Sequence, residues 1–269
     1  MPDCQQMHAG SADAELPPVT SSSPETSVLL VADSHVRTDG EECGEFFDML
    51  DAISRSSVET IVFLGDIFEL WISLPGYSSA ATDRFLAWCR KEKGRRTVGF
   101  VEGNHDFNIA GGEGDAFTFS ARSHWTNEDG LMFTHGDRID RRDVLSTLFR
   151  LVIDCRLMGW LVTRSFGKRL VRWVKRNTGH AKRGRRSGTP KLRTLPESEI
   201  RRFAEAWFKK GVKTILCGHF HQCQVYVYEG AAGQRLQILP AWRETRTLAR
   251  YNPVTGELQT SHWRDLLGE

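Results

Sequence analysis

The sequence predicts an α/β fold, and two patterns within residues 27–269 carry this prediction. Short runs of β-branched and apolar residues, which favour strands, alternate with longer segments whose large apolar residues recur at helical spacing. Five of the apolar runs end directly in a polar cluster that contains Asp, His or Asn. Because α/β sheets bind ligands beyond the carboxyl ends of their strands, we expect the five clusters to meet at one site.

The first half of the chain supplies three of these strands and two helices. Strands are expected at residues 27–32, 60–64 and 96–101, each a compact apolar run. The segment 42–54 has its large apolar residues at helical spacing, and a second helix is expected to end near Gly94. The three strands run into the clusters Asp33-Ser34-His35, Gly65-Asp66 and Gly103-Asn104-His105-Asp106.

The second half supplies two more strands, one helix and a run of hairpins. Strands at 131–134 and 212–217 flank a helix at 197–210, which carries an apolar stripe. Residues 224–228 alternate between apolar and polar and lead to a turn at 230–233. The segments 246–251 and 257–260 flank a second turn at 252–256, so the tail predicts antiparallel hairpins. The two strands run into the clusters His135-Gly136-Asp137 and Gly218-His219-Phe220-His221.

Composition indicates where the folded part lies. Residues 1–26 are rich in Ser, Pro, Ala and Glu, and we interpret them as a disordered leader before one domain at 27–269. The chain has no apolar run of about 18 residues and no secretory signal pattern, so we expect a cytoplasmic protein. The six cysteines are scattered and form no metal or redox motif, which fits a reducing compartment.

The residue types in the clusters are those of a metal site. Imidazole, carboxylate and amide ligands together suit Mn, Fe, Zn or Co. If strand geometry persists into the clusters, ligands two residues apart point the same way. A carboxylate at a strand tip, such as Asp66, can bridge two ions, and two ions can clamp a phosphoryl group and activate a shared water. The expected ligands are Asp33, His35, Asp66, Asn104, His135, His219 and His221.

The five clusters, in this order and with this spacing, resemble the motif blocks of the calcineurin-like metallophosphoesterase superfamily. The resemblance covers about residues 28–250. It implies a four-layer sandwich in which two mixed β-sheets pack face to face between layers of helices. It also implies hydrolysis of a phosphoester or phosphoanhydride by a metal-activated hydroxide.

The same resemblance divides the ligands between two divalent ions, with Mn²⁺ expected and Fe, Zn or Co also suited. One ion would be bound by Asp33, His35, Asp66 and His221. The other would be bound by Asp66, Asn104, His135 and His219.

Further roles are implied for the residues next to these ligands. His105 matches the imidazole that stabilises the transition state or protonates the leaving oxygen. Glu69 falls where many relatives place a carboxylate that orients this imidazole. Asp106 and Asp137 are expected to support the ligand loops as hydrogen-bond acceptors.

A narrower resemblance concerns the substrate. Residues 65–72 resemble the corresponding block of the UDP-2,3-diacylglucosamine diphosphatases of lipid A biosynthesis, which implies release of UMP and lipid X from a lipid-linked nucleotide sugar. This chain departs from that group at His105, where those enzymes carry Arg, and at Ser73-Leu74-Pro75, where they carry acidic residues just after the Trp-Ile step. Two alternatives therefore stay open: another phosphoesterase acting on a nucleotide, nucleic acid or phosphoprotein, and a membrane-attached scaffold without catalysis.

The segment between the fourth and fifth clusters predicts a helical lid at about residues 138–195. Residues 138–186 hold fifteen Lys or Arg and three Asp, a net charge of +12 in a chain of net charge +2. Apolar residues recur among these cations at helical spacing, which favours an anionic membrane surface or lipid over nucleic acid. A solvated basic face over an ordinary helical hairpin is the remaining alternative. Each cation near an anionic leaflet contributes about 1 kcal/mol.

We therefore expect a monomer bound peripherally to the inner face of the membrane. The lid also holds the candidate contacts to a phosphorylated substrate, namely Arg164, Lys168, Arg172 and Asn177.

Overall fold

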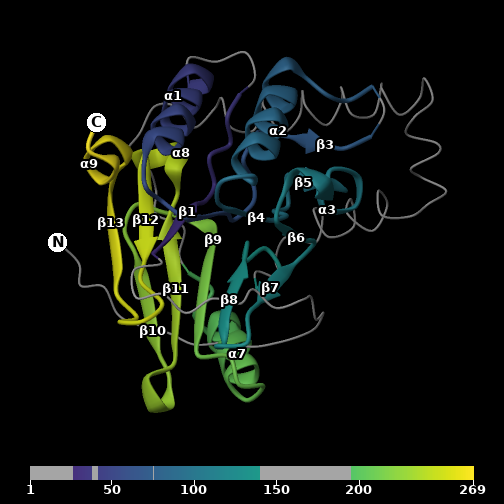
Figure 1. Cartoon of the computed structure of the whole chain (residues 1–269). Coiled ribbons are helices and arrows are strands. Elements are labelled where there is room, and N and C mark those ends of the chain that lie inside the picture. The colour runs from purple at the N-terminus through teal and green to yellow at the C-terminus, as the bar shows by residue number, and fades with distance from the viewer. Residues whose placement is uncertain (1–26, 38–41, 75, 140–194) are drawn as a thin grey trace, which may run out of the picture.

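The computed structural model describes residues 27–37, 42–74, 76–139 and 195–269, which form a four-layer α/β sandwich (Figure 1). The first sheet has six strands in the order β13-β12-β1-β2-β4-β6. Its members are β1 Val28–Val31, β2 Thr60–Phe63, β4 Thr97–Val101, β6 Phe119–Ala121, β12 Thr247–Tyr251 and β13 Leu258–His262. Strands β1, β2, β4 and β6 are parallel, so their carboxyl ends meet at one edge.

The second sheet has five strands in the order β10-β11-β9-β8-β7. Its members are β7 His124–Thr126, β8 Leu131–Thr134, β9 Thr214–Gln222, β10 Tyr226–Glu229 and β11 Arg235–Pro240. Strands β8, β9 and β11 are parallel to one another. A separate parallel pair joins β3 Trp71–Ile72 to β5 Asp106–Phe107.

Helices cover the outer faces of both sheets. Helices α1 Glu42–Arg55, α2 Ala80–Glu92 and α9 Trp263–Leu267 pack on the first sheet, and α7 Glu197–Phe208 packs on the second. Short helices complete the described chain: α3 Ile109–Gly112, η1 Gly114–Ala116, η2 Ala231–Gly233 and α8 Trp242–Thr245.

The period-2 alternation of the strands divides the interior into layers. On β1, Leu29 and Val31 join the core beneath α1 and α2, while Val28 and Leu30 face the second sheet. On β9, Ile215 packs toward α7 and the adjacent Leu216 faces the first sheet. Two sheets packed face to face between helical layers are thus the observed architecture, as the sequence predicts.

Most elements match the sequence-based expectation, with one informative difference. The strand expected at 212–217 begins at Thr214 and continues through Gln222 as β9. It can continue because β11 stays beside it: after a register shift, Pro240 pairs with Gln222. His219 and His221 therefore lie within the end of a strand and not beyond it.

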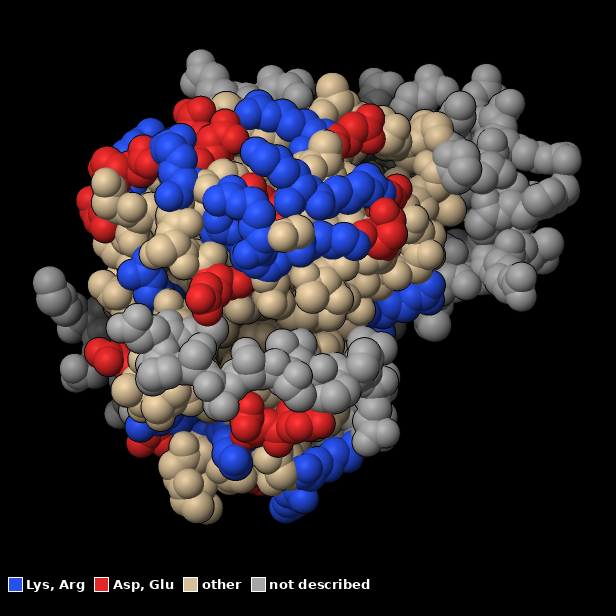
Figure 2. All heavy atoms as spheres, in the orientation of Figure 1, with Lys and Arg blue, Asp and Glu red and all other residues tan. Residues whose placement is uncertain are grey.

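Within the described residues, no helix has the length and apolar character needed to cross a membrane. The expected leader at 1–26 and almost all of the expected lid at 138–195 fall outside those residues. On the face seen in Figure 2, Lys and Arg gather over the upper half with Asp and Glu beside them.

Candidate metal centre

The candidate ligands lie where the parallel strands of the two sheets end. The β1–β2 pairing continues into the ligand loops, because Asp33 N–H donates to Gly65 O at 3.3 Å and His35 N–H donates to Asp66 O at 2.8 Å. In the second sheet the β8–β9 pairing continues in the same way, because Gly218 N–H donates to His135 O at 3.0 Å. These backbone contacts hold segments that are distant in sequence around a common centre.

The φ angles of several ligands differ from those of an ordinary strand, even where His219 and His221 lie within β9. Five candidate ligands adopt left-handed conformations, with φ between 42° and 70°: Asp33, His35, Asp66, His219 and His221. Such values are uncommon for residues other than glycine, and they gather at functional sites where the surrounding structure holds them. The expectation that extended geometry would aim the paired ligands is therefore wrong. In the pairs Asp33/His35 and His219/His221, both ligands are left-handed and one residue separates them. This backbone path turns both side chains of a pair toward the centre.

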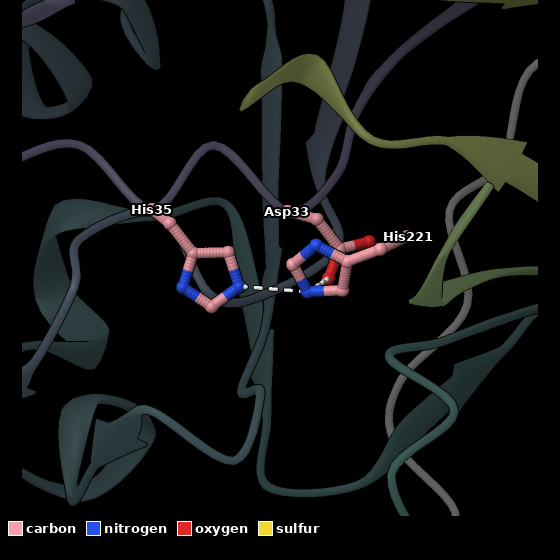
Figure 3. Close-up of side chains that lie close together, drawn as sticks. All are labelled: Asp33, His35 and His221. Atoms are coloured by element: carbon pink, nitrogen blue, oxygen red, sulfur yellow. Dashed lines mark hydrogen bonds and ion pairs between the residues drawn. The ribbon is translucent and has the colours of Figure 1, made fainter. Parts of the chain in front are cut away.

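One half of the centre consists of Asp33, His35 and His221 (Figure 3). The Nε2 atoms of the two imidazoles face each other at 3.1 Å. The His221 Nε2 also lies 3.8 Å from Asp33 Oδ1. Asp33 and His35 are buried, whereas the His221 side chain is partly exposed.

Asp66 lies between the two halves. Its Oδ2 is 3.3 Å from His35 Nε2 on one side and 3.7 Å from His135 Nε2 on the other. A single carboxylate therefore faces ligands of both expected sets, which is the position of a bridging group.

The second half is built around His135. Its Nε2 lies 3.3 Å from Asn104 Oδ1 and 3.3 Å from His219 Nδ1. His135 is fully buried and His219 nearly so. The structure thus brings all seven expected side chains together, from the ends of five strands.

The donor atoms fit divalent ions. Ligands bound to one octahedral ion at about 2.1 Å lie about 3 Å apart, close to the separations seen here. Among the residues that the structure describes, no hydrogen bond reaches the buried Oδ1 of Asp33. An unsatisfied buried carboxylate oxygen is costly, and a cation would satisfy it.

Two glycines make the close packing of ligand carboxylates possible. A Cβ at Gly103 would collide with Asp66 Oδ1, and a Cβ at Gly218 would collide with Asp33 Oδ2. Only a residue without a side chain leaves room for these two carboxylates.

Main-chain carbonyls orient two of the rings. His135 Nδ1 donates to Leu64 O at 2.7 Å, and His105 Nδ1 donates to Glu69 O at 2.7 Å. Each hydrogen bond fixes the tautomer and leaves Nε2 facing inward. Glu69 was expected to orient His105 through its carboxylate, so the atom that makes this contact differs from the expected one. His105 Nε2 lies 3.9 Å from Asp66 Oδ2, beside the ligands.

The electrostatics follow from crowding two carboxylates and several imidazoles in a buried space. Burial alone would raise the pKa of Asp66, but His105 and His135 outweigh it and lower that pKa to about 2. Burial would lower the pKa of His135, but Asp66 and Asp33 raise it to about 9. Burial raises the pKa of Asp33. His135 therefore carries a proton on Nε2, its candidate ligand atom, in the metal-free protein. Binding of a metal ion there would release that proton.

The two expected supporting carboxylates differ in what they contact. Asp106 Oδ2 accepts hydrogen bonds from Asp66 N–H at 2.6 Å and from Gly103 N–H at 2.9 Å, so it ties two ligand loops together. Burial and the adjacent Asp66 raise the pKa of Asp106. Asp137 acts on the site through its charge, which contributes to the raised pKa of His135.

One neighbour of the centre had no sequence signal. The Oε1 of Glu244 lies 3.7 Å from His221 Nδ1, although Glu244 is outside all five motif blocks. The substrate contacts expected in the lid, Arg164, Lys168, Arg172 and Asn177, lie outside the described residues.

A four-layer α/β sandwich with a buried cluster of His, Asp and Asn at its strand ends defines a metal-dependent phosphoesterase. The chain belongs to the calcineurin-like phosphoesterase family, whose model matches residues 26–223.

Relatives and solved structures extend over most of the chain. A UDP-2,3-diacylglucosamine hydrolase of Pseudomonas entomophila is 24% identical over 80% of this chain and 90% of its own length. One of Azotobacter vinelandii is 26% identical over 79% of this chain and 89% of its own length. A dimetal phosphatase from Danio rerio has a TM-score of 0.42 at 15% identity, covering 90% of this chain and 100% of that chain.

Proposed function

We propose that this phosphoesterase hydrolyses the pyrophosphate of UDP-2,3-diacylglucosamine and releases UMP and lipid X. The observation that carries the proposal is the alignment with hydrolases of that name over about nine-tenths of their length. The motif block at residues 65–72 and the basic, apolar segment at 138–186 support the same substrate. The broader conclusion, that the chain is a metal-dependent phosphoesterase, does not depend on the identity of the substrate.

The arrangement of side chains suits hydrolysis at phosphorus. Two divalent ions, with Mn²⁺ proposed, would supply an activated water and positive charge for the phosphoryl oxygens. Asp33, His35 and His221 would hold one ion, and Asn104, His135 and His219 the other. Asp66 would hold both.

The role of His105 follows from the orientation of its ring. Because Nδ1 donates to Glu69 O, the opposite nitrogen faces the ligands and is free to contact substrate. From there Nε2 can stabilise charge on a phosphoryl oxygen or give a proton to the leaving oxygen.

Membrane attachment belongs to the same proposal. A lipid-linked substrate is reached at a membrane surface, and the net +12 segment supplies cations for an anionic leaflet. Cosedimentation with vesicles of phosphatidylglycerol, compared with phosphatidylcholine alone, tests this at low and high salt. Binding that is equal for both lipids contradicts the proposal.

The substrate is tested by direct assay. Purified full-length protein with Mn²⁺ should convert UDP-2,3-diacylglucosamine in detergent micelles to UMP and lipid X, and the D66A variant should not. Water-soluble UDP-N-acetylglucosamine serves as the comparison substrate without acyl chains. Failure to cleave the acylated substrate, beside brisk cleavage of a simple phosphoester, would remove the lipid proposal and leave the enzyme class intact.

A second candidate rests on His105. The diacylglucosamine enzymes carry Arg at the position of this imidazole, whereas His is the usual residue of the wider superfamily. A phosphomonoesterase or phosphodiesterase acting on a nucleotide or phosphoprotein would keep this His. A panel of aryl phosphates, nucleotides and bis-aryl phosphates separates the two candidates by their relative kcat/KM.

A further inference from the structure

We propose that Glu244 is a positioning residue for His221, and that α8 secures two ligands of the same metal ion at once. The proposal rests on the metal centre of the proposed function. It adds a residue outside the motif blocks and a specific consequence for one of the two ions.

The contact has the geometry of a carboxylate behind a ligand ring. Nε2 of His221 faces inward, 3.1 Å from His35 Nε2, while Nδ1 faces outward toward Glu244 Oε1 at 3.7 Å. That separation is one of an ion pair, longer than a direct hydrogen bond. The Glu244 side chain is 32% exposed, so it has room to close the remaining distance.

The same short helix also holds Asp33. The N–H groups of Trp242 and Arg243 donate to Ala32 O at 2.9 Å and to Asp33 O at 3.2 Å. The backbone of this single helical turn therefore hydrogen-bonds to the Asp33 loop. The side chain of Glu244, from the same turn, faces His221. Asp33 and His221 belong to one expected ligand set.

Helix α8 is itself firmly anchored. Trp242 is fully buried, with its ring 5.6 Å from that of Phe46 on α1. Just after the helix, Arg246 Nε donates to Glu45 Oε2 at 2.7 Å. Glu244 is thus presented from a rigid support, as a positioning group requires.

Glu244 differs in kind from the groups that orient two other rings of the centre. His135 and His105 are oriented by the neutral main-chain carbonyls of Leu64 and Glu69. A carboxylate in that position fixes the ring and also raises the basicity of the ligand. Loss of such a partner lowers metal affinity about 10- to 100-fold.

Metal binding by the full-length, metal-free protein tests the inference without any substrate. Calorimetric titration with Mn²⁺ should give two ions per chain for the wild type. In E244Q one ion should bind about 10- to 100-fold more weakly and the other as in the wild type. E244D keeps the charge and should bind the affected ion more tightly than E244Q, with the other ion unchanged.

E257Q is the matched control, because Glu257 is an exposed carboxylate in the β12–β13 turn, at the end of the sheet away from the centre. It should bind both ions as the wild type does. In E244Q, excess Mn²⁺ should restore turnover, which a merely structural defect would not allow. An E244Q variant with both affinities within twofold of the wild type overturns the role of Glu244 alone. A wild-type protein that takes up no Mn²⁺ overturns the metal centre and this inference together.

Discussion

Oδ1 of Asp66 accepts a hydrogen bond of 2.7 Å from the backbone N–H of His105. The other carboxylate oxygen of Asp66 faces His35 and His135, so one side chain touches both halves of the centre and the loop that carries His105. The position of His105 is therefore tied to the candidate ligands through its backbone, and the Nε2 of its imidazole faces them.

This arrangement predicts that His105 affects turnover more than metal content. H105A should lower kcat by a factor of about 10² to 10⁴, the usual contribution of a group that transfers a proton or stabilises charge. Steady-state rates with the best substrate, together with metal analysis, measure both effects. Turnover within twofold of the wild type, or loss of metal along with turnover, would contradict the role given to this imidazole.

Gly103 should tolerate no side chain. In G103A the added Cβ would collide with Asp66 Oδ1, so the carboxylate must move and Mn²⁺ affinity should fall at least about tenfold. Calorimetric Mn²⁺ titration of the metal-free variant measures this.

Gly44 offers the matched control. It lies in α1 and has open space where a Cβ would be, so G44A should leave Mn²⁺ affinity unchanged. It should also stabilise the protein by up to about 1 kcal/mol, because alanine favours helix over glycine. Equal affinities in G103A and G44A would show that the close approach at Gly103 does not matter.

Phe85 on α2 is predicted to stabilise the fold by its packing in the core beneath the Asp66 loop. Its ring lies 5.0 Å from Phe63 and 5.6 Å from Trp71, in the core beneath the Asp66 loop. F85A should lower the free energy of unfolding by about 3 to 5 kcal/mol, by the loss of packing and the cavity left behind. Urea denaturation measures it, with V254A at an exposed position as a control that should change stability by less than about 0.5 kcal/mol.

Glu45 should contribute stability that depends on pH. Burial opposes ionisation of Glu45, but hydrogen bonds from Arg246 and Trp263 outweigh it and hold its pKa below the ordinary 4.5. Because the folded pKa is the lower one, the contribution is fully present above pH 4.5 and is lost as pH falls through the folded value.

E45Q should therefore be less stable than the wild type by about 1 to 2 kcal/mol near pH 7, with the difference shrinking below pH 4.5. Urea denaturation of both metal-free proteins at several pH values measures the difference directly. A difference that stays constant between pH 7 and pH 3 would contradict this account.

Much of the centre could be predicted because each motif block follows an apolar strand. Once the strands at 27–32 and 60–64 are recognised as parallel neighbours, Asp33 and Asp66 must lie close together. The layered fold follows from the same alternation, with Leu29 facing one core and Leu30 the other.

The rest depends on information that residue types do not carry. The left-handed backbone at Asp33 and His221 is uncommon even for Asp and His, so the residue type alone does not predict it. The support of His105 comes from a main-chain oxygen, which any residue at position 69 would provide. Glu244 reaches His221 only through the tertiary placement of α8. Strands such as β3 and β5, of two residues each, are too short to show a period.

The most direct test of the centre is metal content measured together with turnover, in the wild type and in D66A. Full-length protein, reconstituted with Mn²⁺ and freed of excess ions, should hold two ions per chain by elemental analysis. D66A should fold but retain fewer than one ion, with turnover lowered at least about 10³-fold, because both ligand sets lose their shared carboxylate. A D66A protein that keeps two ions and wild-type turnover would contradict the account.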